Sequence, residues 1–129
     1  MRIILADEQL KVRFAIHVLL KPRDELKVVG EAIDAEELLA QIAISNPDVV
    51  ILDWQLPGLE EIGSIPTLKK NNPGLYVIVL SGRPELGQAA LDAGANEFVS
   101  KIDPPEFLLH SLVRCQAHLA QNQAKMKIV

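Results

Sequence analysis

The chain has 129 residues, 49% hydrophobic and 23% charged, which fits one globular domain with a full core. Its net charge of −4 argues against nucleic-acid binding through a basic face of this chain. The single cysteine, Cys115, excludes an internal disulfide and suits a reducing compartment. Because the sequence shows neither a signal-peptide pattern nor an apolar run of ~20 residues, we expect a cytoplasmic protein without membrane contact.

Five short apolar segments alternate with helical ones along the chain. This alternation predicts a parallel β-sheet covered by helices on both faces. The third segment is continuously apolar, as is typical of a strand buried on both sides. The predicted strands cover residues 2–6, 27–32, 48–52, 76–81 and 96–100.

The helices between these strands carry recognisable start signals. Asp34 and Glu37 have the spacing of a capping box and predict the start of the second helix. Because a proline breaks a helix interior, Ser64 is the predicted N-cap of the third helix, with Pro66 in its first turn. A short fourth helix follows Pro84 and contains a glycine, which costs ~1 kcal/mol relative to alanine, so it should be the least stable.

Polar residues gather where the predicted strands end. Asp7 and Glu8 follow the first strand, Asp53 the third, Ser81 ends the fourth, and Lys101 follows the fifth. The carboxyl ends of parallel strands lie at one edge of a sheet, where such folds place their chemistry. Three carboxylates there would repel each other unless a hard cation lay between them, and their oxygens suit Mg²⁺.

Such a group also suits phosphoryl transfer to a carboxylate. A cation and Lys101 would spread the charge that develops when Asp53 attacks a phosphoryl group, and Ser81 would bond a phosphoryl oxygen. Taken singly, each residue has an ordinary interpretation: Asp7 as a helix cap, Ser81 as a turn residue, Lys101 as a solvated lysine. Their joint placement at four strand ends favours the functional interpretation.

The motifs together resemble the receiver domain of two-component response regulators, which has the CheY-like, flavodoxin-type α/β fold. The motifs are the Asp7-Glu8 pair and the segments 53–58, 79–82 and 93–101. The resemblance implies a three-layer α/β/α sandwich, with a five-stranded parallel sheet of order 2-1-3-4-5. It implies a receiver over residues 1–121, with 122–129 as a tail or the start of a linker.

The resemblance also assigns roles to residues near the acidic pair. Asp53 would be the phosphoacceptor, and Glu8 and Asp53 would bind Mg²⁺ directly. Asp7 would act through water, and the main-chain carbonyl of Gln55 would complete the protein ligands.

Three further residues have implied roles in the reaction and its readout. Ser81 would bind the phosphoryl group, Lys101 would neutralise it, and Phe98 would be the switch aromatic. A sensor histidine kinase would donate the phosphoryl group. The chain would then be a signalling switch rather than an enzyme, since its only chemistry is on itself.

A closer resemblance is to receivers of the NarL type, which usually precede a helix-turn-helix DNA-binding domain. It rests on Ala6-Asp7-Glu8, Val12-Arg13 and the segments 28–32 and 105–109. DNA would then be contacted only through an output domain that is absent from this chain. Glu61 and Ile102 depart from the family pattern, which leaves open the loop after Asp53 and the turn after Lys101.

The first helix has more apolar surface than one core face requires. One stripe is Val12, Ile16 and Leu19, and the nearly opposite one is Leu10, Phe14 and Val18. The second stripe is either partly covered surface or a contact for a kinase or a second copy of the chain.

Two other features of the sequence have ordinary interpretations. Cys115 should be buried and inert. His110, Arg114 and His118 share a helix face that is more easily explained as solvated than as a metal site. The alternative to a phosphorylated receiver is a pseudo-receiver that acts as a protein-interaction module; a flavodoxin-like enzyme ranks last, because no glycine-rich phosphate loop is present.

Overall fold

The structure is a computed structural model that describes residues 1–128, with side chains described as far as Lys125. Five parallel strands form one sheet in the order β2-β1-β3-β4-β5, as predicted. The strands are β1 (Arg2–Ala6), β2 (Lys27–Ala32), β3 (Val49–Asp53), β4 (Tyr76–Ser81) and β5 (Glu97–Ser100).

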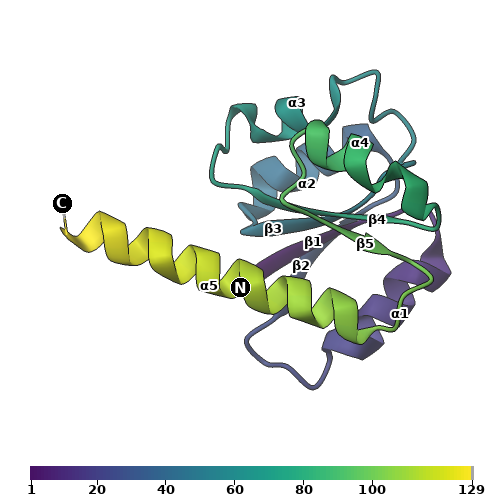
Figure 1. Ribbon diagram of the computed structural model, residues 1–129. Coiled ribbons are helices and arrows are strands. Elements are labelled where there is room, and N and C mark those ends of the chain that lie inside the picture. Colours follow the sequence, from purple (N-terminus) through teal and green to yellow (C-terminus); the bar gives the residue numbers. More distant parts are fainter. Residues whose placement is uncertain (129) are drawn as a thin grey trace.

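Helices cover both faces of the sheet (Figure 1). They are α1 (Leu10–Leu20), α2 (Ala35–Ser45), α3 (Ser64–Lys70), α4 (Gly87–Asp92) and α5 (Glu106–Ile128), with a 3₁₀ turn, η1 (Pro84–Leu86), before α4. One apolar cluster joins the sheet to α2, α3 and α4, and a second joins it to α1 and α5. The predicted three-layer α/β/α sandwich is therefore confirmed.

Strand boundaries agree with the prediction except in the third and fifth strands. The third strand runs from Val49 to Asp53 instead of 48–52, because the Asp48 carboxylate accepts a hydrogen bond from Arg2 N at 2.8 Å before the ladder begins. The fifth begins at Glu97, since the Asn96 side chain caps the neighbouring strand by accepting from Val77 N at 2.8 Å. Asp53 thus belongs to the sheet.

The start of α3 corrects one prediction. Gly63, not Ser64, occupies the N-cap position, and its φ of 97° lies in the left-handed region that favours glycine. Pro66 lies in the first turn, as predicted. The Asp34 cap of α2 is also confirmed, because its carboxylate accepts from Glu37 N at 2.8 Å.

The loop after Asp53 is a series of tight turns that the sequence left open. Leu56 and Leu59 of this loop are buried in the apolar core and anchor the loop to the domain. Its middle is tied to the start of α2, because Ala35 N donates to the Pro57 carbonyl at 2.8 Å. Glu61 is exposed, so its departure from the family pattern does not disturb these anchors.

Helix α5 is longer than the sheet it covers, and its C-terminal half extends away from the domain (Figure 1). No break in the helix marks residue 121, where we expected the domain to end, and the helix continues to Ile128. The last residue of the expected tail, 129, lies outside the described residues.

Gly87, the first residue of α4, lies against an aromatic ring. A Cβ added at Gly87 would come within 3.0 Å of Cδ1 of Phe98. Phe98 is half-buried in β5 and packs on the cluster beneath α4. The glycine that weakens this short helix therefore permits its close approach to the sheet.

This contact predicts the sign of a substitution. Gly87→Ala should lower the free energy of unfolding by about 1 kcal/mol, because overpacking against Phe98 outweighs the gain in helix propensity. In a Phe98→Ala background the same change should stabilise the protein by up to about 1 kcal/mol. Urea unfolding of the four proteins measures both changes, and a stabilising Gly87→Ala in the wild type would contradict this packing.

Candidate functional site

Two carboxylates and one ammonium group meet at the carboxyl edge of the sheet. Asp7 follows β1 and Asp53 ends the adjacent strand β3; both are buried. Lys101, just after β5, places its Nζ 2.8 Å from Asp7 Oδ2 and 3.6 Å from Asp53 Oδ2. The predicted convergence of these three residues is therefore present.

Backbone amides hold the other carboxylate oxygens. Gln9 N donates to Asp7 Oδ1 at 2.8 Å, and Gln55 N donates to Asp53 Oδ1 at 3.1 Å. Each carboxylate therefore has one oxygen fixed by its own loop and the other turned toward Lys101. The Oδ2 atoms of Asp7 and Asp53 therefore both face the Lys101 ammonium group.

Among the described residues, one ammonium group faces two carboxylates at this site, so their negative charge is only partly balanced. Burial raises the pKa of Asp53 and the Asp7 carboxylate raises it further, while the Gln55 amide and Lys101 act in the opposite direction. Asp7 Oδ2 is buried, and no donor among the described residues gives it a well-directed hydrogen bond, although Lys101 Nζ lies nearby. An additional cation would satisfy this oxygen, so the two carboxylates fit a hard metal ion.

The other predicted ligands are less completely assembled. Glu8 is exposed, and no three His, Cys, Asp or Glu side chains in the described part of the chain are grouped closely enough to hold a metal ion. Gln55 lies directly after Trp54 in the loop beside Asp53. The structure thus brings together Asp7 and Asp53 of the predicted acidic triad.

Ser81 and Lys101 are joined at the ends of neighbouring strands. Ser81 is fully buried and follows Leu80, the residue in register with Asp53. Its hydroxyl accepts from Arg83 N at 3.0 Å, and its carbonyl accepts from Lys101 N at 2.8 Å. The Lys101–Ile102 peptide is trans, and Ile102 N bonds back to the Ser100 hydroxyl at 3.3 Å.

One residue near the site escaped the prediction of function. Arg13 served only as a marker of the NarL-type resemblance, yet its side chain is hydrogen-bonded to the main chain of Asp7. No sequence signal indicates this contact, because it depends on how α1 lies against β1 and β2.

A comparison with known families decides the identity of the fold and site. Residues 3–112 match the response regulator receiver domain. The chain belongs to this family. The predicted resemblance is therefore confirmed across most of the receiver.

Relatives of this receiver include regulators with different outputs. It is 36% identical over 120 residues to the transcriptional activator protein ExaE of Pseudomonas putida, covering 91% of this chain and 56% of ExaE. It is 35% identical over 103 residues to protein-glutamate methylesterase/protein-glutamine glutaminase 5 of Myxococcus xanthus, covering 78% of this chain and 30% of that protein. The chain thus spans only about a third to a half of these relatives.

Among solved structures, the receiver is similar to the isolated REC domain of RcsB from Salmonella enterica serovar Typhimurium, in the presence of the phosphomimetic BeF₃⁻. The TM-score is 0.79 at 31% identity, covering 91% of this chain and 88% of that one. RcsB is a NarL-type regulator, so the closer resemblance to NarL-type receivers is also confirmed. No helix in the described part of the receiver is both long and apolar enough to cross a membrane.

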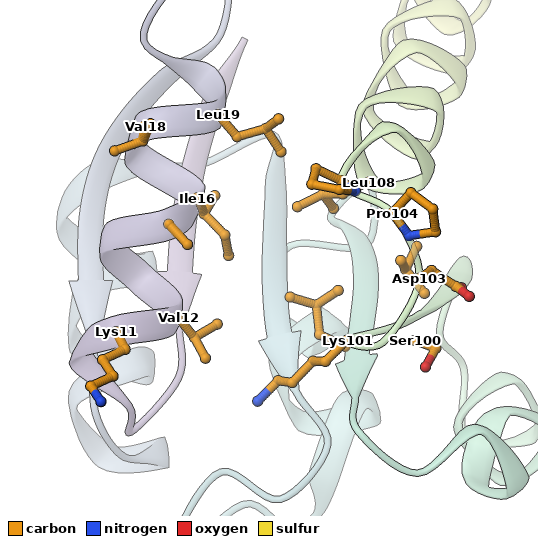
Figure 2. Close-up of a pocket in the computed structure, with 14 residues that line it drawn as sticks. Lys11, Val12, Ile16, Val18, Leu19, Ser100, Lys101, Asp103, Pro104 and Leu108 are labelled. Carbon is orange, nitrogen blue, oxygen red and sulfur yellow. The ribbon is translucent and has the colours of Figure 1, made fainter.

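An apolar groove of about 440 Å³ lies beside the site, between α1 and the start of α5 (Figure 2). Val12, Leu19 and Leu108 are among the residues that line it, and Lys101 lies at its end toward the carboxyl edge. Leu10, Phe14 and Val18 of α1 are more than half exposed, and Val18 also lines the groove. The second apolar stripe of α1 is therefore uncovered surface in this chain.

Cys115 and the histidine-containing face both lie on α5. Cys115 is fully buried, and this burial raises the pKa of its thiol to about 12, which agrees with an inert cysteine. His110, Arg114 and His118 are exposed, as predicted for a solvated face; Arg114 pairs with Glu97, and the tilted His118 ring lies 5.4 Å from the Tyr76 ring. These contacts fix α5 to the sheet.

The site predicts how removing the ammonium group affects stability. Lys101→Met should lower the free energy of unfolding by about 1–3 kcal/mol in a chelator, because two buried carboxylate oxygens lose their cation. Adding Mg²⁺ should reduce the difference in unfolding free energy between Lys101→Met and the wild type. An ion bound to the folded variant supplies the positive charge that its carboxylates have lost.

Urea unfolding of Lys101→Met with and without Mg²⁺ measures both effects. Lys70→Met is the matched control, since Lys70 is exposed at the end of α3 and should have little effect. A Lys101→Met protein as stable as the wild type in chelator would show that the two carboxylates do not need the ammonium group.

Proposed function

We propose that this receiver is phosphorylated on Asp53 by a sensor histidine kinase and changes conformation to control an output. The observation that carries the proposal is the geometry of Asp53. Its carboxylate is buried at the end of β3, with Asp7 and the Lys101 ammonium group at the same place. Such a carboxylate is a nucleophile whose approach to an anion is compensated by positive charge.

Mg²⁺ is the proposed cofactor. Asp7, Asp53, the main-chain carbonyl of Gln55 and Glu8 would hold it, with Asp7 acting through water. Asp7 Oδ2 is the buried oxygen that lacks a well-directed hydrogen-bond donor among the described residues. When bound, the ion would offset the charge of the phosphoryl oxygens during transfer. Glu8 would have to turn inward from its exposed position.

The chemistry itself belongs to Asp53. An Asp53 carboxylate oxygen attacks the phosphorus of a phosphohistidine, the phosphorus–nitrogen bond breaks, and the leaving imidazole takes up a proton. The product is an acyl phosphate on Asp53. Lys101 pairs with one phosphoryl oxygen and the Ser81 hydroxyl donates to another. Water then hydrolyses the acyl phosphate and restores Asp53, so the domain turns over only its own modification.

The added charge gives a route to a conformational change. A phosphoryl group carries about −1.5 to −2 charges at neutral pH. Ser81 would release its bond from Arg83 N to reach this group, which moves the segment before α4. Phe98 and α4 pack against each other at Gly87, so a shift of this segment reaches the ring that we propose as the switch aromatic.

The output is proposed from the relatives. We propose that residues 1–121 form the receiver and that 122–129 begin a linker, in a cytoplasmic protein that regulates transcription. ExaE, a transcriptional activator, and the RcsB structures bound to promoter DNA support this assignment. DNA would be contacted by an output domain, because this chain has a net charge of −4.

A mass measurement tests the proposal. Incubation with acetyl phosphate and Mg²⁺ should increase the intact mass by one phosphoryl group. The gain should be absent without Mg²⁺ and in Asp53→Asn, while Asp48→Asn, at the opposite end of β3, should retain it. An unmodified wild-type protein under these conditions would favour the pseudo-receiver that acts by protein interaction alone.

We further propose that the histidine kinase docks on the groove between α1 and α5 and on the exposed stripe of Leu10, Phe14 and Val18. The groove leads to Lys101, so a partner seated there would bring its phosphohistidine to Asp53. Its lining is mainly apolar, which suits the burial of a partner helix. A homodimer through the same stripe is the other contact to be measured.

Phe14→Glu should slow phosphotransfer from a histidine kinase that phosphorylates the wild type, because it places a charge in an apolar contact. Its phosphorylation by acetyl phosphate and its stability should be unchanged, since Phe14 is exposed. Ile44→Glu on α2 is the matched control, because Ile44 is also exposed and α2 covers the face of the sheet opposite to α1. Sedimentation of Phe14→Glu and the wild type measures whether the stripe forms a homodimer. If Phe14→Glu changes neither phosphotransfer nor the sedimentation of the protein, the stripe is ordinary surface.

A further inference from the structure

Arg13 connects three elements that meet behind the site. It lies in the first turns of α1, and its Nη1 donates to the main-chain carbonyl of Asp7 at 2.6 Å. Its Nε pairs with Glu31 Oε1 of β2 at 2.9 Å. Only 12% of the Arg13 side chain is exposed, so this guanidinium group is held between α1, the β1–α1 loop and β2.

The peptide groups on either side of Asp7 are therefore fixed from two directions. Asp7 N donates to the Ala32 carbonyl of β2 at 3.0 Å, and the Asp7 carbonyl accepts from Arg13. The side chain at the start of α1 does not hold this loop, because Gln9 at the N-cap makes no side-chain capping bond. Instead, Gln9 N binds the Asp7 carboxylate, so the same loop that needs support carries the site's acidic group.

Glu31 neutralises Arg13, so the bond from Arg13 to the Asp7 carbonyl is compatible with a cation site at Asp7. An unpaired guanidinium group close to Asp7 would oppose the binding of a metal ion. Glu31 neutralises it through one carboxylate oxygen and lies 3.3 Å from His17 Nε2 through the other. A charge-assisted bond to the Asp7 carbonyl thus remains without a net positive charge beside the carboxylates.

We propose that Arg13, held by Glu31, is a positioning residue that orients Asp7 and thereby sets the affinity of the site for Mg²⁺. The proposal rests on the proposed function, because it gives Asp7 a role in holding the ion. Arg13 acts through Asp7 and touches neither the ion nor the phosphoryl group. Groups that orient ligands in this way typically contribute 10–100-fold to metal affinity or activity.

Arg13→Gln measures the proposed role through two readouts. Trp54 is the only tryptophan and directly follows Asp53, so its fluorescence is the probe for MgCl₂ titration. The Mg²⁺ affinity should fall roughly tenfold. Phosphorylation by acetyl phosphate should slow at limiting Mg²⁺ and return to the wild-type rate at saturating Mg²⁺, because the defect lies in the affinity for the ion.

Three further variants accompany it. Arg23→Gln is the matched control, because Arg23 also pairs with a glutamate, Glu25, at 3.0 Å but on the surface away from the site; its Mg²⁺ affinity should be unchanged. Glu31→Gln should weaken Mg²⁺ binding in the same direction. Arg13→Lys should retain part of the affinity. These last two variants decide the proposal if Arg13→Gln does not fold.

The outcomes separate this proposal from the proposed function. A lower unfolding free energy with unchanged Mg²⁺ affinity and unchanged phosphorylation would overturn the role of Arg13 and make it a structural residue only. If the wild type binds Mg²⁺ but gains no phosphoryl group, the proposed function fails, whereas a weakened Arg13→Gln titration would still support positioning. A wild type that shows no Mg²⁺ titration would overturn both.

Discussion

The site depends on two buried carboxylates that lie against the same ammonium group. Asp7 and Asp53 end adjacent strands, and Lys101 reaches both from the far side of β4. Burial and mutual repulsion disfavour this state in the absence of another cation, as the raised pKa of Asp53 shows. A site built in this way is ready to bind positive charge and then to receive an anion.

The fold explains how the chain maintains such a place. A parallel sheet brings the ends of β1, β3, β4 and β5 to one edge, and apolar clusters on both faces hold the strands in register. Short loops then turn each polar group inward through backbone bonds, as Gln9 N and Gln55 N do for the two carboxylates. Arg13 adds support from behind, so the position of Asp7 is determined by three elements.

Much of this arrangement was predictable from local sequence, since strand apolarity and strand-end polarity depend on neighbouring residues. The convergence of Asp7, Asp53 and Lys101 followed from the parallel topology alone. The role of Gly87 did not, because it depends on a ring eleven residues away in the chain. Likewise, the contact of Arg13 with Asp7 and the exposure of Glu8 depend on tertiary packing, and the loop after Asp53 required its anchors at Leu56 and Leu59.

In the proposed function, the carboxylate of Asp53 itself becomes the acyl phosphate. Borohydride reduction of the phosphorylated protein converts an aspartyl phosphate to homoserine, and peptide sequencing by mass spectrometry locates the converted residue. We expect homoserine at position 53, in the peptide that contains Trp54. Conversion at another aspartate, or none in a protein that carries a phosphoryl group, would contradict it.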